Sequence, residues 1–161
     1  MEIYHEALAH NKYTCFLKED TVLPMMYMPD LLKGTVSLIQ ADDASLTQRT
    51  YNIGALSFTP RELAASIEKR VPGFTIDYSP DFRQRIAETW PQQLDDSAAR
   101  RDWGWAPEYD LDMMTEDMLL QLEGTVSTER LEAIAENVRL AAEQRQTMMD
   151  FLAAKDEKVK V

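Results

Sequence analysis

The sequence has a single cysteine, little glycine and a shortage of positive charge, and each scarcity excludes a class of protein. Cys15 has no second cysteine with which to form an intrachain disulfide, so a disulfide-stabilised secreted scaffold is excluded. The 17 lysines and arginines stand against 28 aspartates and glutamates, and the net charge of −11 excludes nucleic acid and anionic membrane surfaces as expected partners. The two histidines lie five positions apart near the N-terminus and make a poor metal set, so no metal site is predicted.

Long hydrophobic runs are also absent. No apolar stretch approaches the roughly 18 residues of a membrane-spanning helix, and the first residues lack the basic-then-apolar order of a secretory signal peptide. We therefore expect a soluble intracellular protein, either cytoplasmic or mitochondrial. The 161 residues are 45% hydrophobic, which is sufficient to fill the core of one domain.

The clearest local signal is a helix that begins at Thr59-Pro60-Arg61-Glu62. This segment predicts a capping box, in which Thr59 and Glu62 each accept a hydrogen bond from the other's backbone amide. Apolar residues then follow at helical spacing until Pro72-Gly73 ends the helix. Short β-branched and aromatic runs at Thr50–Ile53 and Phe74–Tyr78 predict a strand on either side. The order of strand, helix and strand suggests a crossover unit.

The segment before this unit predicts two helices and two further extended pieces. A helix is expected from Met1 to about His10, and because no capping residue precedes it we expect the natural chain to begin earlier. Tyr13–Leu17 is expected to be a strand, and Met25–Met28 an edge strand or an ordered loop between two prolines. Asp30 is expected to cap a helix running to about Gln40, which would bury three side chains: Leu32, Val36 and Ile39.

The segment after the unit predicts a long loop and two more helices. Residues 79–96 mix charged side chains with two prolines, which is typical of a loop that packs over something. Asp96 is expected to cap a short helix that ends at Gly104, and Trp103 and Trp105 beside that end are expected to be core. Asp110 is expected to cap a further helix, which would present one apolar face: Leu111, Met114, Met118 and Leu122.

The character of the chain changes at Glu123. Residues 123–161 mix acidic and basic side chains around a narrow apolar stripe, which predicts an amphipathic helix of unknown role from about Thr128 to Leu152. The last residues, from Lys155 onward, are expected to fray. The domain division predicted from the sequence is therefore a body, residues 1–122, and a helical tail, residues 123–161.

Three sequence segments together resemble a known family. They are Leu23 to Asp30 (LPMMYMPD), Tyr51-Asn52-Ile53 leading to Ser57–Glu62 (SFTPRE), and Asp95-Asp96-Ser97 leading to Asp102–Trp105 (DWGW). They resemble the C-terminal part of the extended short-chain dehydrogenases, the NAD-dependent epimerase/dehydratase family, over about residues 1–120. Within it they are most similar to the branch that oxidises L-threonine. The resemblance implies a fold of the α/β class. Within that class, this chain would be the α+β substrate-domain fragment of an extended short-chain dehydrogenase, followed by a C-terminal helical tail.

The resemblance also implies a reaction and a cofactor. The branch converts L-threonine and NAD to 2-amino-3-oxobutanoate and NADH, using a glycine-rich dinucleotide loop and a Tyr-x-x-x-Lys pair. The glycines of this chain are scattered: Gly34, Gly54, Gly73, Gly104 and Gly124. They form no loop that could hold a pyrophosphate, and no tyrosine is followed four positions later by lysine. No catalytic residue is therefore assigned, the cofactor-binding residues are unknown, and the chain alone is not expected to bind NAD.

Three substrate-binding residues are predicted from the resemblance. Trp90 falls where the family places a wall of the substrate pocket, although it could equally anchor the loop. Arg83 falls where sugar-nucleotide relatives keep a phosphate-binding arginine, and its partner could instead be Asp77, Asp81 or Glu88. Leu23 stands where those relatives often carry arginine, a departure that suits a small amino-acid substrate.

Two functional hypotheses remain open. The first is the substrate-side portion of a threonine-oxidising dehydrogenase, which would bind L-threonine or a similar small amino acid and would be inactive alone. The second is a non-enzymatic truncated product that acts as an interaction protein through its acidic body and terminal helix, with a second copy or a full-length homologue as partner. The absent glycine loop and the unmatched tail favour the second; the family motifs favour the first.

Overall fold

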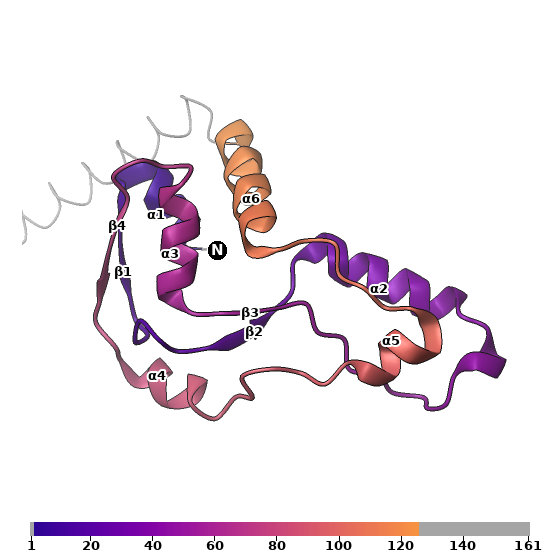
Figure 1. The fold of residues 1–161 in the computed structure, drawn as a ribbon. Helices are drawn as coiled ribbons and strands as arrows, with labels where there is room; N and C mark the ends of the chain where they lie inside the picture. Colours follow the sequence, from indigo (N-terminus) through magenta and orange to yellow (C-terminus); the bar gives the residue numbers. More distant parts are fainter. Residues whose placement is uncertain (1, 126–161) are drawn as a thin grey trace, which may run out of the picture. The chain divides into compact units, whose positions relative to one another are not determined.

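The computed structural model describes residues 2–125 (Figure 1). The helices and strands follow one another as α1 Glu2–His10, β1 Lys12–Cys15, β2 Leu23–Met25, α2 Met28–Gln40, a 3₁₀ turn at Asp43–Ser45, β3 Leu56–Phe58, α3 Pro60–Glu68, β4 Thr75–Tyr78, α4 Phe82–Ala87, α5 Ser97–Trp103 and α6 Leu111–Thr125. The mixture of helix and strand confirms the predicted fold class. The chain divides into two compact units, Met1–Gln121 and Leu122–Val161. The predicted tail helix lies outside the described residues, so it and the boundary at residue 122 stay predictions.

Within residues 2–125, the strands form two small sheets and not one. β1 and β4 pair in parallel, with Lys12 opposite Thr75 and Cys15 opposite Tyr78. β2 and β3 pair antiparallel, with Leu23 opposite Phe58. The strands on either side of α3 therefore belong to different sheets, and the predicted crossover unit is wrong. Of the two alternatives for Met25–Met28, the strand holds only for its first residue, because α2 begins at Met28.

The predicted strand at Thr50–Ile53 is also wrong, since the strand before α3 lies at Leu56–Phe58. Polar groups of residues 47–54 instead bind α5 and the residues on either side of it. Tyr51 donates its hydroxyl proton to Asp102 (2.7 Å), and the Gly54 carbonyl accepts from the indole of Trp105 (2.9 Å). Composition suggested a strand here, but these tertiary partners decided the conformation.

The capping box that opens α3 is confirmed. The Thr59 hydroxyl oxygen accepts from the Glu62 amide (3.1 Å), and the Glu62 carboxylate accepts from the Thr59 amide (2.8 Å). Ile67 is completely buried, and Gly73 beyond the helix has the positive φ of 81° that favours glycine. The predicted first helix is confirmed as α1, which buries Ile3, Tyr4 and Ala7.

Helix α2 is turned opposite to the prediction. Leu32, Val36 and Ile39 were expected to be buried, yet 60%, 50% and 77% of their surface is exposed. Asp30 does not cap the helix, because it lies within the first turn and is itself buried. Its carboxylate instead accepts from the amides of Glu108 (2.8 Å) and Tyr109 (3.2 Å), which ties the start of α2 to the segment before α6.

The predicted loop at residues 79–96 contains α4, a helix of six residues that is too short to show a hydrophobic period. Its cap is Asp81, which accepts from the Arg83 amide (2.8 Å). In α5 the left-handed Gly104 is confirmed at φ 72°, but Asp96 makes no capping hydrogen bond. Its carboxylate is held by Arg100 instead.

The tryptophans at the end of α5 and the apolar residues of α6 mostly behave as predicted. Trp105 is buried, and Trp103 is half-buried with its ring 5.9 Å from that of Trp105. In α6 the Asp110 cap is confirmed by its hydrogen bond from the Met113 amide (2.8 Å). Met114 and Met118 are buried.

Candidate functional site

The three predicted substrate-binding residues line one small hollow. Leu23 comes from β2, Arg83 from α4 and Trp90 from the segment that follows α4. The hollow has a volume of about 140 Å³, and its remaining lining is apolar: Phe16, Leu17, Ile86 and Ala87. Residues as far apart in the chain as 23 and 90 are thus brought to a single place, although their role in binding stays a prediction.

Arg83 is held beside this hollow by two neighbours. Its Nε and Nη2 donate to the Asp81 carboxylate at 2.7 to 3.0 Å, and its guanidinium carbon lies 3.4 Å from the centre of the Phe16 ring. The hydrogen bond from Arg83 holds the pKa of Asp81 below its ordinary value and raises the pKa of Arg83. Of the partners left open by the sequence, Asp81 is therefore the one bound. A ligand carboxylate would have to share the guanidinium with it.

Trp90 separates the apolar hollow from a polar one. It is 54% exposed and also lines a second hollow of about 270 Å³. There the Gln84 side-chain oxygen accepts from the Lys18 amide (2.8 Å) and its nitrogen donates to Glu88 (3.0 Å). Lys18 also pairs with Glu88 (2.8 Å), and its hydrogen bond lowers the pKa of that carboxyl. The two hollows therefore differ in character, because one is lined mainly by apolar side chains and the other by polar and charged ones.

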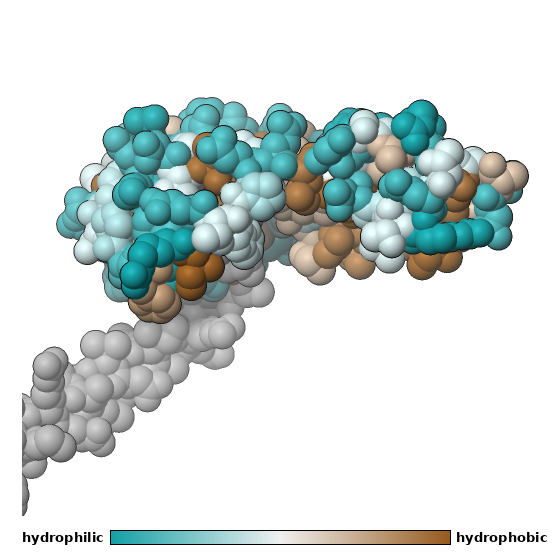
Figure 2. Space-filling view, turned by 90° about the horizontal axis from the view of Figure 1, so that it is seen from below, coloured by the Kyte–Doolittle hydropathy of each residue, from teal (hydrophilic) through white to brown (hydrophobic). Residues whose placement is uncertain are grey.

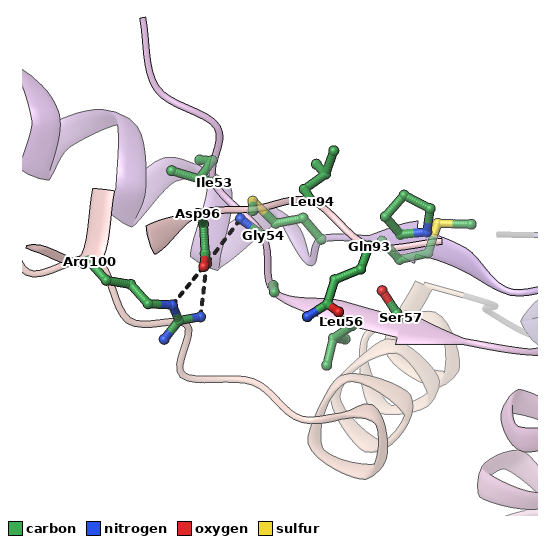
Figure 3. Close-up of a pocket in the computed structure, with 12 residues that line it drawn as sticks. Ile53, Gly54, Leu56, Ser57, Gln93, Leu94, Asp96 and Arg100 are labelled. Atoms are coloured by element: carbon green, nitrogen blue, oxygen red, sulfur yellow. Dashed lines mark hydrogen bonds and ion pairs between the residues drawn. The ribbon is translucent and has the colours of Figure 1, made fainter. Parts of the chain in front are cut away.

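A third hollow was missed by the sequence reasoning (Figure 3). Its volume is about 400 Å³, and it lies between the turn before β3 and the segment that leads into α5. In Figure 3 the Arg100 side chain points at Asp96, whose carboxylate it binds at 2.8 Å through both Nε and Nη2. This pairing lowers the pKa of Asp96. The spacing of four residues between these two charges was the signal that could have identified the pair.

Among residues 2–125, no three histidine, cysteine or acidic side chains lie close enough together to hold a metal ion. Cys15 is buried, and burial raises the pKa of its thiol. No helix of this part combines the length and apolar character needed to cross a membrane.

Comparison with known proteins gives L-threonine dehydrogenases and epimerase/dehydratases among the relatives. The chain is 48% identical over 120 residues to the mitochondrial L-threonine 3-dehydrogenase of Bos taurus, and 44% identical over 125 residues to an uncharacterised epimerase/dehydratase of Staphylococcus haemolyticus. Among solved structures it is similar to L-threonine dehydrogenase from Phytophthora infestans, at 61% identity and a TM-score of 0.76. No family model matches the chain.

These matches cover most of this chain but a minor part of each relative. They span 74%, 76% and 78% of the chain, but only 32% of the cattle protein, 39% of the staphylococcal protein and 41% of the Phytophthora protein. The chain therefore aligns with about a third to two-fifths of a longer protein. The larger part of each relative has no counterpart among these residues.

Proposed function

We infer that this chain, which is the counterpart of part of an L-threonine 3-dehydrogenase in the epimerase/dehydratase family, supplies the substrate-side portion of such an oxidoreductase. The proposed reaction is the oxidation of L-threonine by NAD to 2-amino-3-oxobutanoate and NADH. The single observation that carries the proposal is the convergence of Leu23, Arg83 and Trp90 on one hollow, in a chain with these relatives. The reaction itself requires groups that this chain does not contain.

The hollow suits the methyl-bearing end of a small amino acid. Leu23 and Trp90 offer apolar contact, and a cavity of about 140 Å³ is too small for a sugar nucleotide. Arg83 provides a cation at the rim, already neutralised in part by Asp81. In this proposal Trp90 orients the substrate and excludes water on one side, while the hydride acceptor and the proton-transferring group come from the rest of the enzyme.

The chain by itself is expected neither to bind NAD tightly nor to oxidise threonine. The reason is the absence from its sequence of the glycine-rich loop and of the Tyr-x-x-x-Lys pair. Calorimetric titration with NAD and an absorbance assay for NADH measure both properties on the 161-residue chain. Turnover above a protein-free blank would contradict this expectation.

A fusion tests the proposed function directly. Residues 1–125 replace the matching part of the Phytophthora infestans enzyme, which retains its own remaining segment, and the fusion is assayed with L-threonine and NAD. Trp90→Ala should lower kcat/KM by roughly tenfold or more, because it removes one wall of the hollow. The matched control is Phe82→Ala, since Phe82 is an aromatic residue of the neighbouring α4, is 63% exposed and does not line the hollow.

The outcomes separate the two functional hypotheses. A fusion that oxidises threonine and loses activity with Trp90→Ala alone supports the substrate-side assignment. Equal losses from Trp90→Ala and Phe82→Ala would make Trp90 a packing residue and remove the proposed site. A fusion that folds but never oxidises threonine would favour the alternative, an interaction protein, for which the exposed apolar face of α2 is the supporting observation.

A further inference from the structure

The small hollow beside Trp90 has two walls that are far apart in the chain. One wall comes from the loop between β1 and β2 and from the start of β2: Phe16, Leu17 and Leu23. The other comes from α4 and the residues after it: Arg83, Ile86, Ala87 and Trp90. Non-covalent contacts between the two walls therefore set the width of the hollow.

The wall from α4 gains little from apolar burial. Ile86 is 52% exposed and Trp90 is 54% exposed. Figure 2 shows hydrophobic residues (brown) among hydrophilic ones (teal) in the part of the molecule that holds α4. Because the stabilisation from burying apolar surface scales with the area removed from water, these two side chains do little to fix α4 against the loop. Polar contacts therefore matter more for the attachment of this wall.

Gln84 is a buried side chain that connects the two walls. It lies in α4 and is 5% exposed. Its Oε1 accepts from the Lys18 amide (2.8 Å) and from the Thr21 hydroxyl (3.1 Å), both in the loop between β1 and β2. Its Nε2 donates to the carboxylate of Glu88, directly after α4 (3.0 Å). A side-chain amide is both acceptor and donor, so this one group binds the loop on one side and the end of α4 on the other.

The backbone after α4 couples the position of Trp90 to that of Gln84. The Glu88 amide donates to the Gln84 carbonyl (3.0 Å), and the Trp90 amide donates to the Ala87 carbonyl (3.1 Å). These turns are short and closed by their own hydrogen bonds, so Trp90 moves with the last turn of α4. A shift of that turn away from the loop widens the hollow.

Two other contacts between the loop and α4 do not replace Gln84. The Lys18–Glu88 ion pair spans the same gap (2.8 Å), but its side chains are 56% and 50% exposed, and an exposed pair contributes little to the free energy of folding. The Asp81 amide donates to the Phe16 carbonyl (3.2 Å), which holds the beginning of α4 and not its end. The last turn of α4 therefore depends most on Gln84.

We propose that Gln84 is a positioning residue of the candidate substrate site: it holds the last turn of α4, and with it Trp90, against the loop between β1 and β2. Gln84 does not line the small hollow itself, so it acts through Trp90 and not by contact with a substrate there. The consequence for threonine binding rests on the proposed function. The position of Trp90 does not, and it is measurable on the chain alone.

Two variants of the 161-residue chain remove and restore the hydrogen bonds of Gln84. Gln84→Met keeps a side chain of similar length, but its sulfur is a weak acceptor and it has no donor, so the contacts to both sides are lost. Gln84→Glu combined with Glu88→Gln exchanges the amide and the carboxylate and leaves the net charge unchanged. The new carboxylate accepts from the Lys18 amide and the Thr21 hydroxyl, and the new amide donates to that carboxylate.

The matched control is Ser66→Ala. Ser66 is another buried polar side chain, 2% exposed, and its hydroxyl joins α3 to α6 by donating to Asp112 (2.6 Å). It lines neither of the two hollows beside Trp90. Its loss should therefore lower stability without moving Trp90.

The position of Trp90 is followed by fluorine NMR of chains labelled with 5-fluorotryptophan. The three tryptophans give three resonances, of which Trp90→Phe identifies one, and those of Trp103 and Trp105 report on the rest of the fold. In Gln84→Met we expect the Trp90 resonance to lose roughly half or more of its displacement from the unfolded frequency, while the other two stay in place. The double substitution should return it to its native frequency, and Ser66→Ala should leave all three unchanged.

Several spectra would overturn the proposal. A Trp90 resonance that does not respond to Gln84→Met, that moves as much in Ser66→Ala, or that lies at the unfolded frequency in the native chain would each do so. Equal shifts of all three tryptophans would mean that Gln84 supports the whole fold and not this wall. Failure of the double substitution to restore the resonance would show that the hydrogen bonds are not the cause.

The fusion with the Phytophthora segment measures the consequence for the substrate. At equal folded fraction, Gln84→Met should raise the KM for L-threonine roughly threefold or more and leave the KM for NAD unchanged, and the double substitution should restore the former. A variant that is merely less stable lowers the apparent kcat with its folded fraction and keeps its KM, which is the result expected for Ser66→Ala. An inactive fusion would contradict the proposed function, while the fluorine spectra would still decide whether Gln84 positions Trp90. An active fusion whose KM for threonine ignores Gln84→Met would refute the positioning role and leave the function standing.

Discussion

Replacing Gly34 by alanine should destabilise the chain, although the same change in an unpacked helix stabilises it. Gly34 lies in the middle of α2, on the face that meets Trp105. A Cβ at this position would lie 2.8 Å from Cζ3 and 3.3 Å from Cη2 of the indole, and 3.1 Å from Cδ1 of Ile53. The first distance is shorter than atoms tolerate, so either the helix or Trp105 must move.

The expected size of the effect comes from two opposing contributions. Alanine is favoured over glycine in a helix by about 0.8–1 kcal/mol. Overpacking of a filled site costs about 1–3 kcal/mol. Trp105 is 3% exposed and its Nε1 is held by the Gly54 carbonyl at 2.9 Å, so it cannot turn away without losing that hydrogen bond. The overpacking cost should therefore lie in the upper part of its range, about 2–3 kcal/mol, and after the gain in helix propensity we expect Gly34→Ala to lower the free energy of unfolding by about 1–2 kcal/mol.

A double-mutant cycle identifies the cause. Urea unfolding is followed by far-ultraviolet circular dichroism, because fluorescence would change with the tryptophan itself, and midpoints are compared at equal denaturant slope. Trp105→Phe removes the part of the ring that the new Cβ would meet. In that background only the 3.1 Å approach to Ile53 opposes the helix preference for alanine, so Gly34→Ala should be close to neutral. A gain of about 1 kcal/mol from Gly34→Ala in both backgrounds would refute the reasoning, because only helix propensity would then be acting.

Two further predictions concern buried or shielded carboxylates. Asp102 has its pKa lowered to about 2, first by the hydrogen bond from the Thr47 hydroxyl and next by that from Tyr51. The ionised Asp102 therefore stabilises the fold above its ordinary pKa of 3.8, and this contribution is lost as the pH falls toward 2. We expect the difference in unfolding free energy between the native chain and Asp102→Asn to shrink over that pH range, which acid titrations of unfolding measure. Asp30→Ala should lower the free energy of unfolding by about 1.5–3 kcal/mol, because it removes the charged acceptor of two backbone amides, and Asp30→Asn should recover part of this loss. Equal stability of the native chain and Asp30→Ala in thermal unfolding would mean that those two hydrogen bonds do not hold α2 in place.

The sequence predicted elements whose signals are local. The capping box at Thr59, the left-handed Gly104 and the Asp110 cap each depend on residues within about four positions, and all three are confirmed. Elements whose partners are distant in the chain were predicted less well. Nothing near Tyr51 indicates that its hydroxyl binds Asp102, 51 positions away, and so the strand expected there is absent.

The candidate site shows the same division. Leu23, Arg83 and Trp90 were selected by family resemblance, and no spacing in the sequence indicates that they line one hollow. The partner of Arg83 was left open among three acids, and the choice of Asp81 follows from α4, a helix too short for its period to be read. The hollow around Asp96 and Arg100 was missed because its other walls come from residues 24–26, 53–57 and 93–94.

The orientation of α2 is the most informative failure, because its hydrophobic period was read correctly and its environment was not. Period alone says that one face of a helix prefers an apolar neighbour; it does not say which body supplies that neighbour. Gly34 fits the close approach of Trp105, and Asp30 fits the two amides before α6, so the inner face is specified by contacts within this chain. The outer stripe, formed by Leu32, Val36 and Ile39, contributes little to the stability of the described residues, since it stays exposed. Burial of these three side chains, as their spacing predicts, would require a neighbour that the described residues do not supply. The residues of α2 thus divide into an inner face, whose contacts lie within this chain, and an outer stripe, whose apolar residues have no cover among residues 2–125.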